Sequence, residues 1–364
     1  MILRAGTYNV NNLFRRARLF QEPGFSKKSA PVLKDISRLC TLIDRKVYTP
    51  AIKSEMISIL TKYQFDQRPS PNPWFTINEV RNKLVTIKKN GAIEIAADGR
   101  ADWVGSVDLK EEVVPEESTW NTGRVIKAIG VDVLCLVEIE DRQAITEFNK
   151  GILQELKTDF GHNMSIEGND DRGIDVGIYS RWPITSIQSH IDDTYKDKAG
   201  KKQRVFSRDC PVFQIEYRKG KFLYMICNHF KSKGYGDQGS SDRKRTKQAE
   251  QVAEILKQFD LNSDLVIIAG DLNDTPKSGP LKPLMKVKGL TDVLSMQSDP
   301  RNTYISGNDQ IDYLLISRPL KDAFRKCGVE RRGWSKKGVA SFKEVTSKAT
   351  QASDHAAVWA EFEL

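Results

Sequence analysis

Short apolar runs, separated by polar and glycine-containing segments, recur along most of this chain. A stretch at 241–259 places Ala249, Val252 and Leu256 on one side and predicts an amphipathic helix. The apolar runs predict β-strands at residues 3–10, 131–137, 174–179, 211–217, 222–227, 264–269, 311–316 and 356–362. Many strands with a few intervening helices predict an α/β fold of packed layers.

The segment from about residue 15 to 120 has a different pattern. It holds one expected helix near 50–64. Farther on, Asn90-Gly91 joins two β-favouring runs, which is typical of a tight hairpin turn. We interpret this segment as an insertion or sub-domain that follows the first strand of a single domain spanning residues 1–364.

The tetrapeptide Gly270-Asp271-Leu272-Asn273 directly follows the strand predicted at 264–269. Positions i and i+2 of an extended segment point the same way, so Asp271 and Asn273 are expected to share one face. A carboxylate there can bind a metal or take a proton, and an amide can donate hydrogen bonds to an oxyanion. The same residues are common in turns that cap strands, and both interpretations stay open on these four residues alone.

Polar residues also stand at the ends of the other predicted strands. The chain has only four histidines, and two of them, His229 and His355, occupy such positions. The set comprises Asn9, Glu138, Asp175, Arg208, Asn228-His229, Asp312 and Ser353-Asp354-His355. Any one of these residues is more commonly structural than catalytic. So many polar and titratable side chains at strand ends nevertheless favour a single reaction site.

The formal net charge of +9 favours polyanionic partners such as nucleic acid. Each basic cluster alone is typical of a solvated face, whereas several clusters near candidate site loops favour a phosphate backbone. The clusters are Arg15, Arg16 and Arg18; Lys196, Lys198, Lys201, Lys202 and Arg204; Arg243, Lys244, Arg245 and Lys247; and Arg331, Arg332, Lys336 and Lys337.

Composition also bears on cellular location. No apolar run approaches the roughly 18 residues that a membrane span needs. The five cysteines show no paired spacing, so reduced thiols are expected. The first residues do not resemble a secretory signal. We therefore expect a cytoplasmic protein that has no membrane association and needs no obligate protein partner.

The motifs follow one another in a characteristic order. They are Thr7-Tyr8-Asn9-Val10, Val137-Glu138, Ser207-Arg208-Asp209, Asn228-His229-Phe230-Lys231-Ser232, Gly270-Asp271-Leu272-Asn273, Ile311-Asp312-Tyr313 and Ser353-Asp354-His355. This order resembles the endonuclease/exonuclease/phosphatase superfamily, with its deoxyribonuclease I-like fold, along nearly the whole chain outside the insertion. The resemblance implies a four-layered α/β/β/α sandwich of two packed mixed sheets flanked by helices, with the site at one edge of the sheets. It also implies divalent-metal hydrolysis of phosphate esters.

The resemblance and the chemistry of the ligands agree on a metal site. Glu138 is the expected ligand of a hard cation such as Mg²⁺, with Mn²⁺ or Ca²⁺ as alternatives. Asn9 and Asp354 are expected to complete or orient the coordination sphere. Val137 stands where the family often has a glutamine before its metal-binding glutamate, which removes a polar neighbour of the ligand. A one-metal site and a two-metal site both remain open.

The remaining roles are those of acid–base and phosphate-binding groups. Asp271 is expected to orient or deprotonate the attacking water, and Asn273 to hold a phosphate oxygen. His355 is expected to contact the phosphate or act as general base, with Asp312 fixing its tautomer. By the same logic His229 needs a carboxylate partner.

Asp175 occupies the position at which secreted deoxyribonucleases carry a glutamate that pairs with this histidine, so a His229–Asp175 pair is expected. Which histidine is the base stays open. Arg208 is expected to clamp phosphate charge. The residues expected to bind substrate are therefore Arg208, Asn228 and Asn273.

Taken together, the sequence predicts a divalent-metal-dependent phosphodiesterase, a nuclease that hydrolyses DNA or RNA endonucleolytically. The motif around His229 is closer to bacterial nuclease-like members than to the repair type. The main alternative is a phosphomonoesterase acting on inositol or other small phosphates. A catalytically inactive nucleic-acid-binding module is a third candidate, which the complete set of acids, amides and histidines disfavours.

Overall fold

The computed structural model describes residues 1–13, 25–67, 70–110, 116–170, 172–197, 199–233, 237–307 and 309–364. The chain divides into two compact units, Met1–Phe14 with Val114–Leu364 and Arg15–Val113. Each unit has its own hydrophobic core. The basic residues Arg15, Arg16, Arg18 and Lys198, which the sequence marks as parts of two clusters, lie outside the described residues.

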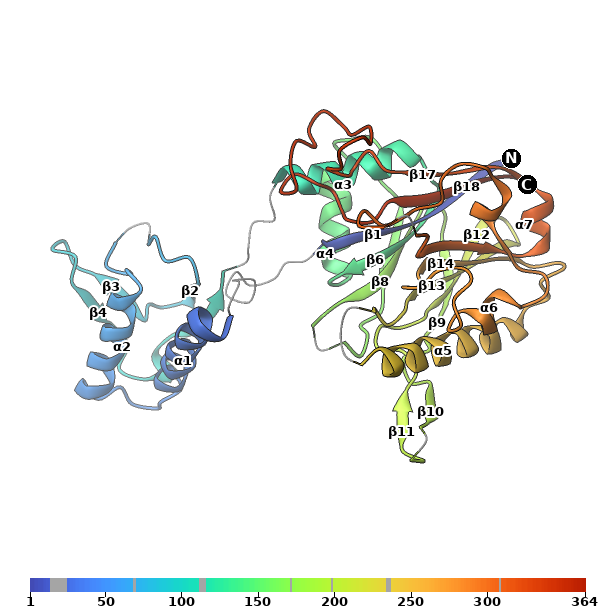
Figure 1. Ribbon diagram of the computed structural model, residues 1–364. Helices are drawn as coiled ribbons and strands as arrows, with labels where there is room; N and C mark the ends of the chain where they lie inside the picture. Colours follow the sequence, from blue (N-terminus) through green and yellow to red (C-terminus); the bar gives the residue numbers. More distant parts are fainter. Residues whose placement is uncertain are drawn as a thin grey trace. The chain divides into compact units, whose positions relative to one another are not determined.

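The larger unit contains two six-stranded sheets (Figure 1). The first has the order β17 (Phe324–Glu330), β18 (Ala357–Glu363), β1 (Ile2–Leu13), β6 (Val133–Ile139), β8 (Asp175–Ser180), β7 (His162–Ser165). The second has the order β15 (Thr291–Asp292), β16 (Asp312–Ile316), β14 (Leu265–Asp271), β13 (Lys221–His229), β12 (Val212–Arg218), β9 (Ile184–Gln188). Both sheets are mixed, because one central pair in each, β1–β6 and β13–β14, is parallel and the other pairs are antiparallel.

The core lies between the two sheets and is continued on their outer faces. In β6, Val133 and Val137 are buried in the same cluster as Met225 of β13 and Ile267 of β14. The alternate residue Leu134 is buried in a second cluster, on the outer face. A strand that is buried on both faces has a nearly continuous apolar sequence, which explains the run in β6.

Helices cover the outer face of each sheet. The cluster on the first sheet includes residues of α3 (Glu116–Ile129) and α4 (Arg142–Phe148). The cluster on the second includes residues of α5 (Gln238–Ile255) and α6 (Lys282–Met285), and the short helix α7 (Arg318–Asp322) follows β16. The predicted four-layered sandwich of two mixed sheets flanked by helices is therefore confirmed.

A two-stranded ribbon belongs to neither large sheet. Its strands, β10 (Thr194–Lys196) and β11 (Lys202–Arg204), pair antiparallel, and Figure 1 shows them projecting from the body of the larger unit. The ribbon interrupts the connection between β9 and β12.

The smaller unit combines α1 (Phe25–Ile43) and α2 (Pro50–Lys62) with two small sheets. One sheet pairs β2 (Phe75–Arg81) with β5 (Val104–Leu109), and the other pairs β3 (Val85–Ile87) with β4 (Ile93–Ile95). Leu39, Leu60, Phe75 and Trp103 are among its fully buried residues. In both units, none of the helices within the described residues is long and apolar enough to cross a membrane.

Candidate active site

Three strands of the second sheet end in one row of titratable side chains. The parallel register of β13 and β14 places His229 opposite Asp271. The antiparallel register of β14 and β16 places Asp271 opposite Asp312. Directly opposite residues of neighbouring strands share one face of a sheet. The registers therefore bring His229, Asp271 and Asp312 together from distant positions in the chain.

Gly270 permits the close approach of β14 to β13 at this row. Its φ is 137°, and a Cβ atom there would lie 1.9 Å from the carbonyl oxygen of Asn228. No side chain fits without a shift of the backbone, so the position requires glycine.

Asp271 is buried and held by two amide side chains. Asn9 Nδ2 donates to its Oδ2 at 3.3 Å, and Asn273 donates to it from the backbone N at 2.8 Å and from Nδ2 at 3.1 Å. Nδ2 of Asn273 also donates to the carbonyl oxygen of Phe230 at 3.1 Å. The structure thus brings Asp271 and Asn273 together, and the carboxamide of Asn273 positions the carboxylate. Burial raises the pKa of Asp271 to about 7, against the opposing effect of His355.

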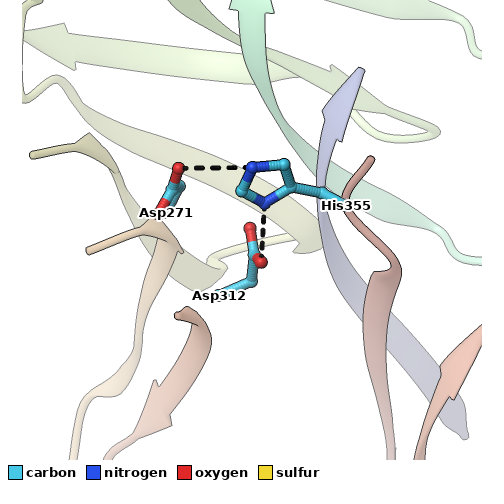
Figure 2. A group of neighbouring side chains, drawn as sticks. All are labelled: Asp271, Asp312 and His355. Atoms are coloured by element: carbon cyan, nitrogen blue, oxygen red, sulfur yellow. Dashed lines mark hydrogen bonds and ion pairs between the residues drawn. The ribbon is translucent and has the colours of Figure 1, made fainter. Parts of the chain in front are cut away.

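His355 has a fixed carboxylate partner (Figure 2). Its Nδ1 lies 2.9 Å from Asp312 Oδ2, and its Nε2 lies 3.9 Å from Asp271 Oδ2. Burial alone would lower the pKa of His355, but the Asp312 and Asp271 carboxylates outweigh it and raise the pKa to about 10. Ser353 Oγ accepts from the backbone N of His355 at 3.0 Å and donates to the carbonyl oxygen of Asn9 at 2.7 Å. These two hydrogen bonds link the segment that precedes β18 to β1.

His229 has no such partner. Its Nε2 lies 3.8 Å from Glu138 Oε1 and 3.8 Å from Asp271 Oδ2, whereas its Nδ1 is buried without a hydrogen-bond partner among the described residues. Burial lowers the pKa of His229 well below its ordinary value, and the positive charge of Arg208 lowers it further.

The expected His229–Asp175 pair is not formed. Asp175 Oδ1 instead accepts from the backbone N of Gly168 at 2.7 Å. Aspartate is one methylene shorter than the glutamate of the secreted enzymes, which reduces its reach by about 1.5 Å. Burial raises the pKa of Asp175 to about 7, and the hydrogen bond from Gly168 lowers it only in part.

Of the expected substrate-binding residues, the structure brings Arg208 and Asn273, but not Asn228, to the site. Arg208 is buried, and its Nε lies 3.1 Å from Asp170 Oδ2. Asp170 was missed by the sequence reasoning, because it lies in a loop and its only signal is proximity to Asp175 in the chain.

Asn228 points away from His229, because neighbouring residues of a strand face opposite sides. Its Nδ2 donates to the carbonyl oxygen of Ile226 at 3.0 Å, and its Oδ1 accepts from Cys210 Sγ at 3.2 Å. The expectation that Asn228 binds substrate is therefore corrected to a structural role within the core.

Glu138 occupies an irregular position at the end of β6. Its φ is 62°, in the left-handed region that a glutamate seldom adopts, and the pairing of β6 with β8 shifts register between Val137 and Ile139. Such backbone strain gathers at functional sites. The side chain is 21% exposed, so it remains accessible.

The donors around Glu138 fit a hard cation. Burial raises the pKa of Glu138, and the negative charge of Asp354 adds to that effect, whereas hydrogen bonding from Asn9 lowers it. The neighbouring carboxylates of Glu138 and Asp354 are ligands of the type that Mg²⁺ prefers. Asn9 turns its Nδ2 towards Asp271, and its Oδ1 accepts from the backbone N of Asn11 at 3.0 Å.

A second group with ligand atoms within 4.8 Å of one another comprises Asp271, Asp312 and His355. In this second group His355 and Asp312 already bond to each other, so Glu138 and Asp354 are the better candidates for metal ligands, with Asn9 orienting Glu138.

Residues 118–355 match the model of the endonuclease/exonuclease/phosphatase family. No curated protein sequence matches the chain. Among solved structures, an endonuclease/exonuclease/phosphatase family protein from Bacteroides thetaiotaomicron has 13% identity and a TM-score of 0.52, with 100% of this chain and 99% of that chain covered.

Two further structures resemble the chain over a smaller part. The endonuclease/exonuclease/phosphatase from Bacteroides vulgatus has 13% identity and a TM-score of 0.48, covering 68% of this chain and 91% of that chain. The human Nocturnin catalytic domain with bound sulfate anion has 14% identity and a TM-score of 0.48, covering 68% of this chain and 86% of that chain.

Proposed function

Because the chain belongs to the endonuclease/exonuclease/phosphatase family, we propose that it is a divalent-metal-dependent phosphodiesterase that cleaves the backbone of nucleic acid endonucleolytically. Members of this family are generally phosphoric ester hydrolases. One observation supports the proposal most strongly. Asp271 Oδ2 lies 3.8 Å from His229 Nε2 and 3.9 Å from His355 Nε2, so two imidazoles approach the same buried carboxylate oxygen.

Asp271 would orient the attacking water and take its proton. A carboxyl whose pKa burial has raised to about 7 can accept a proton near neutral pH. Asn9 and Asn273 hold the carboxylate in place. His355 is kept cationic by Asp312 and would stabilise the negative charge that grows on the phosphate oxygens.

Glu138 and Asp354 would hold the divalent cation and Asn9 would orient Glu138, with Mg²⁺ the first candidate. When bound, such a cation neutralises phosphate charge and polarises the ester. Arg208, buried beside Asp170, would add a second fixed positive charge. The net charge of +9 agrees with a polyanionic substrate.

A substrate panel tests the proposal. Supercoiled plasmid, abasic duplex, RNA, inositol phosphates, a chromogenic diester and a chromogenic monoester are incubated with Mg²⁺ and, separately, with chelator. We expect nicking of the plasmid and cleavage of the chromogenic diester with Mg²⁺ alone. Hydrolysis confined to inositol phosphates or the monoester would contradict the proposal in favour of a phosphomonoesterase. Binding of nucleic acid without any hydrolysis would contradict it in favour of an inactive binding module.

A further inference from the structure

The predicted basic clusters differ in how far their charges are already neutralised. In α5, Arg245 is completely buried between Asp274 and Asp242, so the cluster at 243–247 is partly structural. In the cluster at 331–337, Arg332 pairs with Glu330. In contrast, the ribbon lysines that the structure describes, Lys196, Lys201 and Lys202, are exposed.

The ribbon has two unlike faces. Its register pairs Thr194 with Arg204, Tyr195 with Gln203, and Lys196 with Lys202. Because opposite residues share a face, Tyr195 and Gln203 occupy one side. The other side, here called the basic face, consists of Thr194, Lys196, Lys202 and Arg204.

The Tyr195 side is fixed to the body of the unit. Tyr195 packs against the hydrophobic cluster under α5, and Lys244 Nζ lies 5.8 Å from the centre of its ring. Lys244 also donates to the carbonyl oxygen of Arg204. At the ribbon's turn, Asp197 accepts from the backbone N of Ala199 and of Lys201, each at 2.9 Å. These contacts hold the basic face in a defined orientation.

Within the part of the chain that the structure describes, the positive charges of the basic face are only partly neutralised. Lys196 and Lys202 are exposed and directly opposite each other, and no ion pair joins either of them to an acidic side chain among the described residues. Like charges in directly opposite positions destabilise a strand pair. Arg204 pairs with Asp192, which is itself 83% exposed. A polyanion placed on this face would remove the repulsion.

The ribbon also leads directly into the active site. Arg204 ends β11 only four positions before Arg208. The intervening segment is joined to the loop of Asp170, because the backbone N of Asn169 donates to the carbonyl oxygen of Ser207 at 2.6 Å. A polymer bound at Asp271 can therefore extend towards the basic face.

We propose that the basic face binds the phosphate backbone of a double-helical nucleic acid whose scissile phosphate lies at Asp271. This inference rests on the proposed function. A two-stranded β-ribbon fits the major groove, which is about 12 Å wide. Single-stranded sites instead offer exposed aromatic rings for stacking. Tyr195, the only aromatic residue from 192 to 205, lies on the covered side.

The test compares two pairs of lysines. The ribbon variant carries Lys196→Gln and Lys202→Gln. The control carries Lys219→Gln and Lys221→Gln, which remove the same charge from the exposed β12–β13 turn, at the far end of β13 from His229 and about 26 Å away. Binding of a labelled duplex and of a single strand of the same sequence is measured by fluorescence anisotropy against salt, with chelator present.

For the duplex, the salt slope of log K should fall by about 2 and the affinity at 0.1 M salt by roughly tenfold or more in the ribbon variant, but not in the control. Equal behaviour of the two variants, or equal losses on duplex and single strand, overturns the inference. Melting temperatures of both variants confirm that they fold. A separate measurement tests the proposed function. If the wild-type protein hydrolyses no ester with Mg²⁺, the proposed function is wrong, whatever the binding experiment shows.

Discussion

The two histidines of the candidate site approach the same oxygen of Asp271 but have opposite surroundings. His355 bonds to Asp312 at 2.9 Å, and this carboxylate helps to raise its pKa to about 10. His229 has no partner at Nδ1 among the described residues, and burial lowers its pKa well below the ordinary value. Both imidazoles are buried and both lie near carboxylates, so the difference follows the carboxylate that bonds directly to Nδ1 of His355. We therefore expect His355 to stabilise phosphate charge as a cation and His229 to remain neutral and able to take a proton.

Removing the carboxylate that the two histidines share should have the largest effect. Asp271→Asn should reduce kcat by roughly 10⁴-fold, because it removes the carboxylate proposed to accept the proton of the attacking water. The measurement is hydrolysis of a chromogenic diester. Asp292→Asn removes another buried carboxylate from the same sheet, outside the site, and serves as the control for folding. Near-wild-type turnover by Asp271→Asn would remove the proposed base.

The next largest effect should come from Glu138, the carboxylate on the His229 side. Glu138→Gln should weaken Mg²⁺ binding and reduce the hydrolytic rate by roughly 10³-fold, because an uncharged amide is a poorer ligand for a hard cation. Calorimetric titration with Mg²⁺ measures the binding. Glu140→Gln removes the same charge two residues farther on. Unchanged affinity in the first variant would place the metal elsewhere.

Breaking the His355–Asp312 contact should bring the pKa of His355 closer to that of His229. Asp312→Asn should lower the pKa of His355 from about 10, so its positive charge would be lost at a lower pH. We expect about 100-fold less activity at pH 8 and an alkaline limb of the rate profile shifted downwards. NMR titration of the imidazole measures the pKa. Asp193→Asn breaks the His190–Asp193 contact, also 2.9 Å long, away from the site, and should leave the limb in place.

Lengthening the side chain of Asp175 should bring the pKa of His229 closer to that of His355. Asp175→Glu adds one methylene, about 1.5 Å of reach, to the carboxylate that was expected to pair with His229, whose Nδ1 has no hydrogen-bond partner among the described residues. The pKa of His229 should rise, and kcat should change by no more than about tenfold. NMR titration again provides the measurement, with Asp175→Asn as the variant that has no charge. No change in the His229 resonance would mean that the chain keeps the carboxylate away.

The smallest effect concerns stability alone. The folded-state pKa of Asp175, about 7, lies above the unfolded value, so the folded protein binds more protons between about pH 4 and pH 7. The contribution of Asp175 to stability therefore falls as the pH rises through that window. Asp175→Asn should flatten the dependence of the melting temperature on pH from 5 to 7.5. An unchanged slope would contradict the assigned pKa.

The sequence was most informative where a residue's place followed from strand ends. Asp271 and Asp312 end or begin strands that pair directly, and His355 precedes the last strand, so their meeting required only the correct fold. Asn228 could also have been placed, because it adjoins His229 in one strand and alternation forbids both side chains to face the site.

Other contacts were beyond the sequence. The separation of Asp175 from His229 depends on a difference of one methylene and on the backbone of Gly168, which a strand pattern does not locate. Arg245, which the sequence placed in a basic cluster, is buried on the inner side of α5. Its ion pair with Asp242 forms within the helix, whereas its ion pair with Asp274 depends on where another loop passes. Loop positions set these distances, and no periodic pattern encodes them.

The left-handed backbone of Glu138 bears on how this protein would respond to selection. At φ 62°, a glycine would relieve roughly 1 kcal/mol of conformational strain, and it would also remove the acid next to Asp354. A library selected only for heat resistance should therefore accumulate glycine or asparagine at this position and lose hydrolysis. Repeated selection for activity should restore glutamate and its thermodynamic cost. The residue at position 138 would thus show whether a lineage had been selected for heat resistance or for hydrolytic activity.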